Sequence, residues 1–316
     1  MKLLLQHGHC LLEKQLNLNV EEVIDFGITI ITDGAWSHRG WSANECAVSI
    51  FEVSTGKLLD LEVVIRQLPS DTYGNYAGAS SQMESEGLRR ICRRLKDKGV
   101  TVSGLLHDGD GSSFGVVTEF WKDAKEICDN GNAAKNFRKA IIKLAKTHPK
   151  VANMGETCLK AFKFALNECN GSPSAFTKIM WHQYEHFCNW NHKHCTHSEE
   201  YQPVSWNWVT EETAQIALKA EFQRVINNSD RYCQNLSSNV CEAFANSRTK
   251  FTDKRLHQRV QFPLGGILAA LSFYVRKDLT FHWKKVLLEA IDISVSTHMQ
   301  QHFTKETETT VLNAEK

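Results

Sequence analysis

Three aspartates stand where carboxylates could hold a metal ion. Asp33 follows the apolar run 28–32, and Asp108 and Asp110 follow an apolar run that ends at residue 106. Apolar, β-branched runs of this length predict strands. Carboxylates at the ends of neighbouring strands can bind divalent ions that activate water or a hydroxyl for phosphodiester chemistry. The pattern therefore indicates an enzyme that acts on phosphodiester bonds.

The same residues also have a structural interpretation, which the spacing alone leaves open. Each of the three aspartates is followed by a glycine. Asp-Gly after a strand is a common turn signal, and an aspartate before a helix often caps it. Asp110 is either a supporting group beside Asp108 or the metal ligand itself.

Composition excludes several other classes of protein. The chain has 316 residues, of which 42% are hydrophobic and 23% charged, as in globular proteins. No apolar run approaches the roughly 20 residues of a membrane helix. Ten scattered cysteines favour a reducing compartment, and hence a nuclear or cytoplasmic protein. The net charge of +1 is low for a nucleic-acid binder, although local basic clusters can supply phosphate contacts.

The elements expected in the first half have a recognisable order. Three strands come first, with a tight turn at 54–57 between the second and third, and strands and helices then alternate. This order matches a ribonuclease-H-like core, an α/β fold in which the first and fourth strands are neighbours. Asp33 and Asp108 would then face one metal site. The expected strands are 28–32, 46–53, 58–66, 100–107 and 124–128, and the expected helices are 81–98, 112–121 and 133–146.

The second half is predicted to be helical throughout. Its expected helices are 151–169, 174–187, 210–227, 239–249, 264–274 and 281–299, followed by a polar tail from 304. We therefore expect a helical insertion within the α/β core. The predicted domains are an N-terminal extension (1–26), the first part of the core (27–148), the insertion with a Cys/His-rich loop (149–235), the closing helices (236–302) and a disordered tail (303–316).

A dense group of histidines and cysteines falls within the insertion. Residues 182–197 contain five histidines and two cysteines, which is enough for a tetrahedral zinc site. The spacing matches no standard zinc finger, so a polar aromatic loop with incidental histidines is the alternative. The candidate zinc ligands are Cys188, His192, His194, Cys195 and His197.

Basic residues gather on two expected helices, 81–98 and 133–146. Either group could contact DNA phosphates, and the alternative for each is a solvated helix face. Tryptophans of the insertion could stack on unpaired bases or pack in the interior. The candidate DNA-binding residues are Arg89, Arg90, Arg93, Arg94, Lys135, Arg138 and Lys139, with Lys143 and Lys146 nearby and Trp190, Trp206 and Trp208 as the tryptophans.

Several segments together resemble the Mutator-like transposase domain. They are 31–40 (ITDGAWSHRG), 76–87 (YAGASSQMESEG), 107–114 (HDGDGSSF) and the turn at 55–57. The family's first motif reads roughly Asp-Gly-Thr/Ser-Trp-x-x-Arg-Gly, and its later one roughly Gly-Asp-Gly-Asp-Ser-x-x-Phe. The resemblance is strong over 28–146 and weaker over 230–300.

This resemblance implies a ribonuclease-H-like transposase core with an Asp-Asp-Glu triad. The aspartates map to Asp33 and Asp108, and the glutamate to Glu242 within 239–246 (NVCEAFAN). Glu212 and Glu221 are less favoured alternatives for the third acid. The implied cofactor is Mg²⁺ or Mn²⁺, with Zn²⁺ in the Cys/His loop as a further expectation. The implied partners are transposon ends and target DNA, bound by an oligomer of the chain in the nucleus.

One departure from the family favours a second hypothesis. The family often carries Cys-x-x-His near the fifth strand, whereas Asn132 stands where the histidine is expected and Cys128 is one residue out of register. This departure and the low net charge suggest a catalytically inactive DNA-binding or chromatin-interaction protein derived from a transposase. A structure-selective nuclease without transposition is a third hypothesis.

Overall fold

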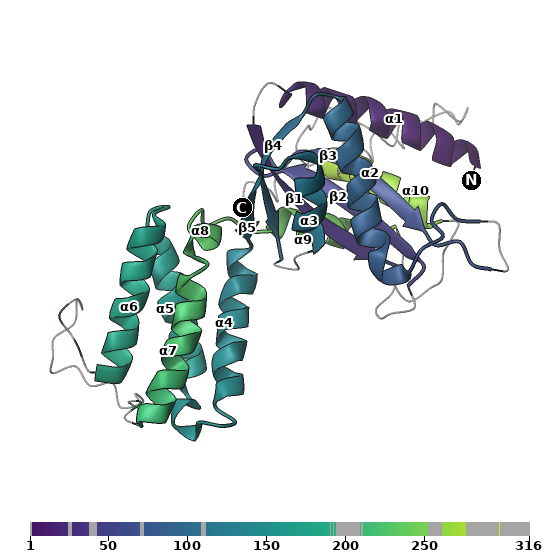
Figure 1. The fold of residues 1–316 in the computed structure, drawn as a ribbon. Coiled ribbons are helices and arrows are strands. Elements are labelled where there is room, and N and C mark those ends of the chain that lie inside the picture. Colours follow the sequence, from purple (N-terminus) through teal and green to yellow (C-terminus); the bar gives the residue numbers. More distant parts are fainter. Residues whose placement is uncertain are drawn as a thin grey trace. The chain divides into compact units, whose positions relative to one another are not determined.

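The computed structural model of the protein describes residues 2–24, 27–37, 43–69, 73–108, 112–189, 191, 193, 209, 211–251, 261–275 and 297. Apart from Thr297, the helix expected at 281–299 lies outside these residues, as does the expected tail. The chain divides into two compact units, whose elements are labelled in Figure 1. Unit 1 comprises Met1–Leu105, Gly111–Ala124 and Ser238–Lys316, and unit 2 comprises Leu106–Asp110 and Lys125–Ser237. The domain boundaries drawn from the sequence stay a prediction.

The described strands form one mixed sheet in the order β3-β2-β1-β4-β5. β2 pairs antiparallel with both β1 and β3. β1 is also the neighbour of β4, as expected for the first and fourth strands, so the ribonuclease-H-like α/β fold is confirmed. The strands are β1 (Gly27–Trp36), β2 (Glu45–Glu52), β3 (Leu58–Ile65), β4 (Thr101–His107) and β5 (Lys125–Cys128).

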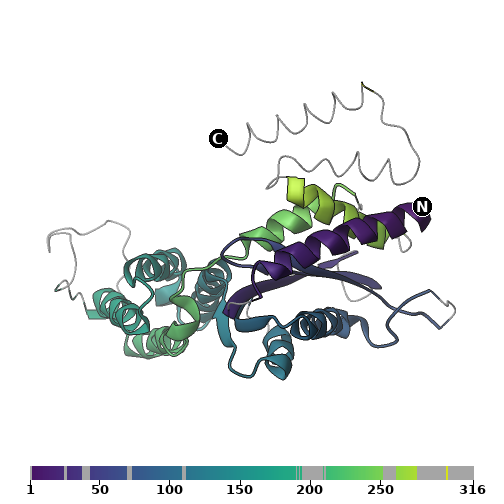
Figure 2. The same ribbon diagram turned by 90° about the horizontal axis from the view of Figure 1, so that it is seen from above.

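Helices of unit 1 cover both faces of its strands (Figure 2). α2 (Met83–Asp97) and α3 (Ser112–Phe120) lie on one face. α1 (Lys2–Glu21), α9 (Asn239–Arg248) and α10 (Phe262–Val275) lie on the other. The sheet strands between these layers are therefore largely apolar on both sides, and all eight residues of β2 are buried.

α2 follows the short 3-10 turn Ser80–Gln82 and has the amphipathic pattern that the sequence predicts. Its apolar residues recur at helical spacing and are buried against β1, β2 and β3. Gly87 lets the helix approach closely, because a Cβ there would lie 2.6 Å from Val48 Cγ2. The buried apolar residues of α2 are Met83, Leu88, Ile91, Cys92 and Leu95.

The structure excludes the alternative of a turn at Asp33-Gly34. β1 continues through Asp33 and Gly34 to Trp36, and Gly34 pairs with Val48 of β2. The glycine serves a close approach instead: a Cβ at Gly34 would lie 2.5 Å from Cδ of Glu84. The ladder with β2 thus extends the strand beyond the apolar run that the sequence marks.

The turn between β2 and β3 agrees with the sequence. Gly56 has φ of 61°, which a glycine adopts without a steric penalty. Glu52 organises the turn because its carboxylate accepts hydrogen bonds from Ser54 N (2.8 Å), Ser54 Oγ (2.9 Å) and Thr55 N (2.5 Å). Burial alone would raise the pKa of Glu52, but these hydrogen bonds lower it.

α1 lies in the segment that the sequence analysis assigns to an N-terminal extension. Leu12, Leu16 and Val20 are buried, and α1 packs on β3 and α10. Asn19 Nδ2 donates to Leu58 O at 2.6 Å. Packing against distant parts of the chain therefore stabilises this helix. Among the described residues, no helix combines the length and apolarity needed to cross a membrane.

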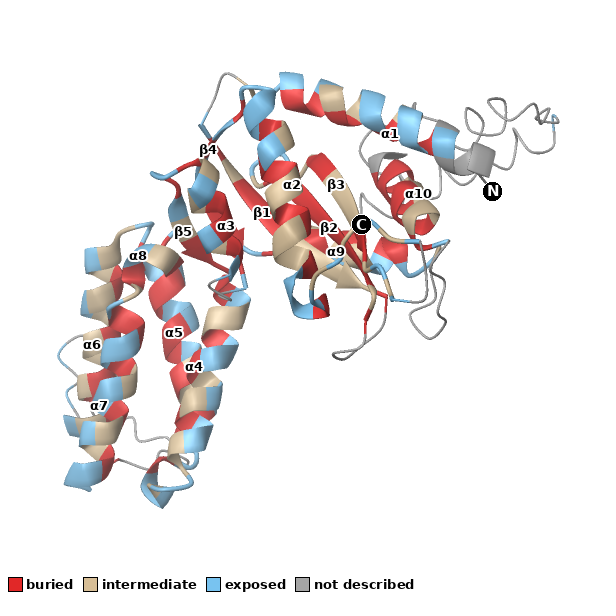
Figure 3. Cartoon of the chain, turned by 45° about the vertical axis from the view of Figure 1, so that its right-hand side comes forward, coloured by how far each residue is buried: buried red, intermediate tan, exposed pale blue. Residues whose placement is uncertain are grey.

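Unit 2 is a helical bundle with its own aromatic core. Its helices carry buried residues on one side and exposed residues on the other (Figure 3). Phe137, Phe162, Phe176 and Phe222 are fully buried at its centre. The helices are α4 (Asn130–Leu144), α5 (Met154–Glu168), α6 (Pro173–Asn189), α7 (Glu212–Ile226) and the short α8 (Ser229–Tyr232), with a 3-10 turn at Pro149–Val151.

The two ends of unit 2's helical segment are tied together. Asn130 N, at the start of α4, donates to Leu236 O at 3.3 Å. Asn130 Nδ2 donates to Asn235 Oδ1 at 3.0 Å. The segment thus leaves unit 2 beside the point where α4 begins.

Candidate active site

Asp33 lies on the sheet face that α9 and α10 cover. Side chains alternate along a strand, so Asp33 shares a face with Ile31. Ile31 pairs with Phe51, and the Phe51 ring is 5.4 Å from the ring of Phe244 in α9, between centroids. Asp33 itself is half-buried and pairs with Ser49.

Glu242 lies in the first turn of α9, the helix on that same face. The side of α9 against the strands carries Phe244 and Arg248, and Arg248 Nη1 donates to Ala35 O at 2.8 Å. Glu242 is exposed, and at 100° per residue it lies about 160° around the helix axis from Phe244, on the side of α9 away from the strands. Within unit 1, the helix of the predicted third acid and the strand of the first acid are therefore in contact.

Arg248 supplies a buried positive charge on this face. Its guanidinium lies 3.8 Å from the centroid of the Phe262 ring, measured from Cζ. Burial lowers the pKa of Arg248 to about 10, although the nearby Cys46 opposes the shift. No pattern in the sequence predicts this arginine, because its partners are a backbone carbonyl and a ring distant along the chain.

Asp108 directly follows β4 and is exposed. Its Oδ1 accepts a hydrogen bond from Asn132 Nδ2 at 2.7 Å. Asn132 lies in the first turn of α4, where its backbone N–H donates to the N-cap residue Asp129 at 2.7 Å. The start of α4 therefore holds one oxygen of Asp108, and no other described residue forms a hydrogen bond with its second oxygen.

The end of β4 is fixed by a second group of contacts. His107 is buried, and its Nε2 lies 3.0 Å from Glu126 Oε1 in β5. Arg231 donates to the same Glu126 oxygen, and Asp129 N donates to His107 O at 3.0 Å. No local sequence pattern marks this cluster, because its members lie far apart along the chain.

β1 and β4 are neighbours in the sheet, and contacts within unit 1 join the chain at their starts. A Cβ at Gly99 would lie 3.6 Å from Ile24 Cδ1, and Ser103 Oγ donates to Ile28 O at 3.0 Å. Both pairs advance in the same direction along the chain, so the start of β4 lies beside the start of β1.

The predicted metal ligands are only partly described. No three histidine, cysteine or carboxylate groups among the described residues lie together as metal ligands. Asp110, a possible ligand, lies outside those residues. The chemistry of the donor set nevertheless suits Mg²⁺ or Mn²⁺, because Asp33, Asp108 and Glu242 all offer carboxylate oxygens.

Both alternatives for the third acid, Glu212 and Glu221, lie on α7 in unit 2. Glu212 is exposed, and Glu221 accepts a hydrogen bond from Arg224 at 2.9 Å. Neither is on the helix that packs against β1.

The zinc hypothesis rests mostly on residues outside the described part of the chain. Among its candidates only Cys188 is described, and burial raises the pKa of its thiol to about 11. Zinc binds the thiolate, so metal binding would have to offset this shift. The zinc site stays a prediction. The remaining candidates, and the tryptophans proposed to stack on bases, lie outside the described residues: His192, His194, Cys195, His197, Trp190, Trp206 and Trp208.

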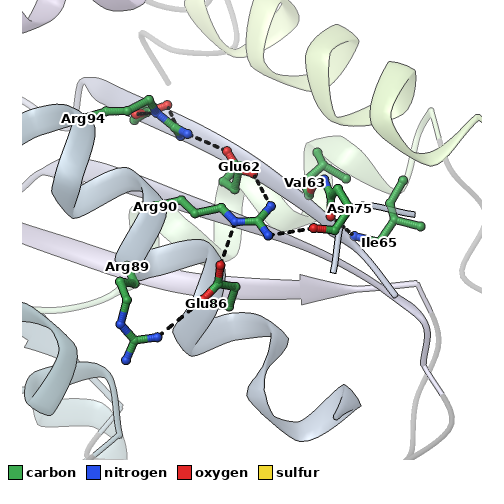
Figure 4. A network of polar contacts seen from close by, with 9 residues as sticks. Glu62, Val63, Ile65, Asn75, Glu86, Arg89, Arg90 and Arg94 are labelled. Carbon is green, nitrogen blue, oxygen red and sulfur yellow. Dashed lines mark hydrogen bonds and ion pairs between the residues drawn. The ribbon is translucent and has the colours of Figure 1, made fainter. Parts of the chain in front are cut away.

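The arginines of α2 have acidic partners within unit 1. Arg90 contacts Glu86 at 2.8 Å and Glu62 at 3.1 Å, and Arg94 contacts Glu62 at 2.6 Å (Figure 4). Arg94 also pairs with Asp60, and Arg89 pairs with Glu119 and Glu86. Arg93 is exposed. The first basic group is thus largely part of an ion-pair network that joins α2 to β3.

The second basic group lies on α4 and is more open. Lys135 and Lys139 are exposed, whereas Arg138 pairs with Glu156 of α5 at 2.5 Å. The two predicted basic groups therefore differ: the arginines of α2 are mostly paired with carboxylates, whereas two lysines of α4 are exposed.

The strand order and the helices on both faces define a ribonuclease-H-like α/β protein. A family profile described as Mutator-like transposase matches residues 9–202, more than half of the chain. The chain therefore belongs to the Mutator-like transposase family, and a transposase-related function with binding to DNA follows from this membership. The comparison with curated proteins gives no match.

Proposed function

We propose that the chain is a transposase catalytic domain that cleaves DNA and transfers the cut strand by metal-dependent phosphoryl transfer. Its catalytic carboxylates are those of Asp33, Asp108 and Glu242. The observation that carries the proposal is the strand order, in which β1, the strand of Asp33, is the neighbour of β4, the strand that ends before Asp108.

The environments of the two aspartates support this assignment. Among the described residues only one oxygen of Asp108 accepts a hydrogen bond, and Asp33 is on the α9 side of its strand. Glu242, exposed on the outer side of α9, is assigned from the family resemblance alone. Mg²⁺ or Mn²⁺ bound by these carboxylates would activate the attacking hydroxyl and stabilise the leaving oxygen. Asp110 is a further carboxylate in the loop after Asp108.

For DNA contacts, the proposal favours the basic group on α4. The charges of Arg89, Arg90 and Arg94 are largely balanced by carboxylates of unit 1. Lys135 and Lys139 are exposed, and no carboxylate in the described part of the chain forms an ion pair with either. Arg93 and Arg138 are secondary candidates.

Cleavage of duplex and supercoiled DNA in Mg²⁺ or Mn²⁺ tests the enzymatic proposal. We expect cleavage by the natural chain and background cleavage by Asp33→Asn, Asp108→Asn and Glu242→Gln, because each change removes a metal-binding charge. Glu168→Gln is the matched control, an exposed acid outside the candidate site that should leave cleavage unchanged. Equal activity of the natural chain and Asp108→Asn would overturn the proposal.

The second candidate function is DNA binding without catalysis, and Asn132 at the family's histidine position favours it. It predicts DNA binding that is unaffected by the three carboxylate substitutions, with no metal-dependent cleavage. We further propose that the chain acts in the nucleus and assembles on DNA as an oligomer. Imaging of the tagged full chain and light scattering of the DNA complex test these two points.

A further inference from the structure

One face of α4 carries a row of positive charge. Asn132, Lys135, Lys139 and Lys143 fall within an arc of about 80° around the helix axis, at 100° per residue. The three lysines are exposed. We call Lys135, Lys139 and Lys143 the α4 lysine row.

The opposite face of α4 packs in the core of unit 2. Ala134, Phe137 and Ile141 are buried there. The helix is thus fixed by its apolar side, and the orientation of the α4 lysine row is set by that packing.

The stretch of sequence that contains the row carries positively charged residues and no negatively charged ones. No aspartate or glutamate occurs from 130 to 155, whereas six lysines and arginines do. Arg138 lies off the row and pairs with Glu156. Within the described part of the chain, none of the three lysines of the row forms an ion pair. The row therefore offers three charges to an anionic partner.

The row begins beside a proposed catalytic group. Asn132 is its first position, and Asn132 Nδ2 donates to Asp108 Oδ1 at 2.7 Å. Lys135 follows after about 4.5 Å of helix rise, and Lys139 and Lys143 come at further steps of about 6 Å. The charges thus lead away from Asp108 along a single line.

We propose that the α4 lysine row binds successive backbone phosphates of the DNA strand whose scissile bond lies at Asp108. A single line of lysines with a polar amide at its start matches a single line of phosphates. The position of the scissile bond rests on the proposed function, whereas the binding surface itself does not.

Salt-dependent binding of a DNA duplex in EDTA, where cleavage is prevented, tests the surface. Replacing Lys135, Lys139 and Lys143 together by alanine should reduce the slope of log affinity against log salt by roughly 2.7, at about 0.9 for each phosphate contact. The matched control replaces three other exposed lysines of unit 2, namely Lys160, Lys163 and Lys178. Equal slopes for the two triple variants, or no change in either, would overturn the proposal.

Neutral methylphosphonate linkages then test the direction of the strand. A linkage that faces Lys135 should weaken binding of the natural chain but cost Lys135→Ala much less. Lys143→Ala should likewise be insensitive to one neutral linkage, and that linkage should lie further from the cleaved bond than the one that faces Lys135. The reverse order would contradict the proposed direction. If the α4 lysine row binds DNA but the chain shows no cleavage, the proposed function is overturned. The proposal that the row is a DNA-binding surface then still holds.

Discussion

At the scale of single residues, the hydrogen bond between Asn132 and Asp108 is the most specific feature of the candidate site. An amide donor at this place orients the carboxylate and occupies one oxygen. A neutral asparagine can therefore fill the place of the family's histidine. The departure from the family motif is thereby compatible with a retained metal site.

Replacing Asn132 by alanine should weaken metal binding. Loss of a group that orients a metal ligand typically costs about 10- to 100-fold in affinity or activity. Mn²⁺ binding, measured by electron paramagnetic resonance, should weaken in Asn132→Ala, and cleavage should need more metal. Asn132→His, which restores a donor, should recover both. Asn136→Ala, an exposed change on the same helix, is the control, and an unchanged Mn²⁺ affinity in Asn132→Ala would exclude the role.

The residues of the candidate site were only partly predictable. Asp33 and Asp108 can be found from the sequence because each follows an apolar run of strand type. The contact of Asn132 with Asp108 and that of His107 with Glu126 join positions 24 and 19 residues apart, and no local pattern marks them. Only the pairing of strands and the start of α4 bring these groups together.

At the scale of elements, the sequence predicts those helices and strands whose apolar residues recur at a regular spacing. The alternating strands and the apolar face of α2 follow from side-chain periodicity. β1 extends past its apolar run because β2 continues the ladder through Gly34. α1 escapes prediction because its stability comes from β3 and α10, the latter more than 240 residues away in the chain.

The turn between β2 and β3 should depend on pH through Glu52. Its pKa is lowered in the folded state, so its stabilising effect is present above the unfolded pKa and is lost as pH falls through the folded one. Glu52→Gln should lower the free energy of unfolding at pH 7 by about 1–2 kcal/mol. Urea unfolding between pH 7 and pH 3 should show this difference shrinking in acid. The exposed change Glu21→Gln should not produce it, and a difference constant with pH would refute the role of the charge.

At the scale of the whole molecule, two hydrophobic clusters among the described residues each lie within one unit. The core of unit 1 is built on its strands and α2, and that of unit 2 on a cluster of aromatic rings. Each core contains residues of one unit alone. Local stability should therefore differ between the units.

Phe162→Ala tests this independence. Phe162 is fully buried, with the Phe176 and Tyr232 rings 5.6 and 5.5 Å away between centroids. The change should cost unit 2 about 3–5 kcal/mol. Hydrogen exchange should then accelerate in α4–α8 but not in β1–β3. The half-exposed neighbour Phe164 gives the control, Phe164→Ala, and equal acceleration in both units would show one cooperative fold.

The tie between Asn130 and residues 235–236 has a consequence for the helices between them. A segment whose entrance and exit are joined spans almost no distance in the fold that hosts it. Gains or losses of helix within that segment need not move the strands before it or the helix after it. A change in the length of a helix inside this segment is therefore expected to leave its two joined ends in place.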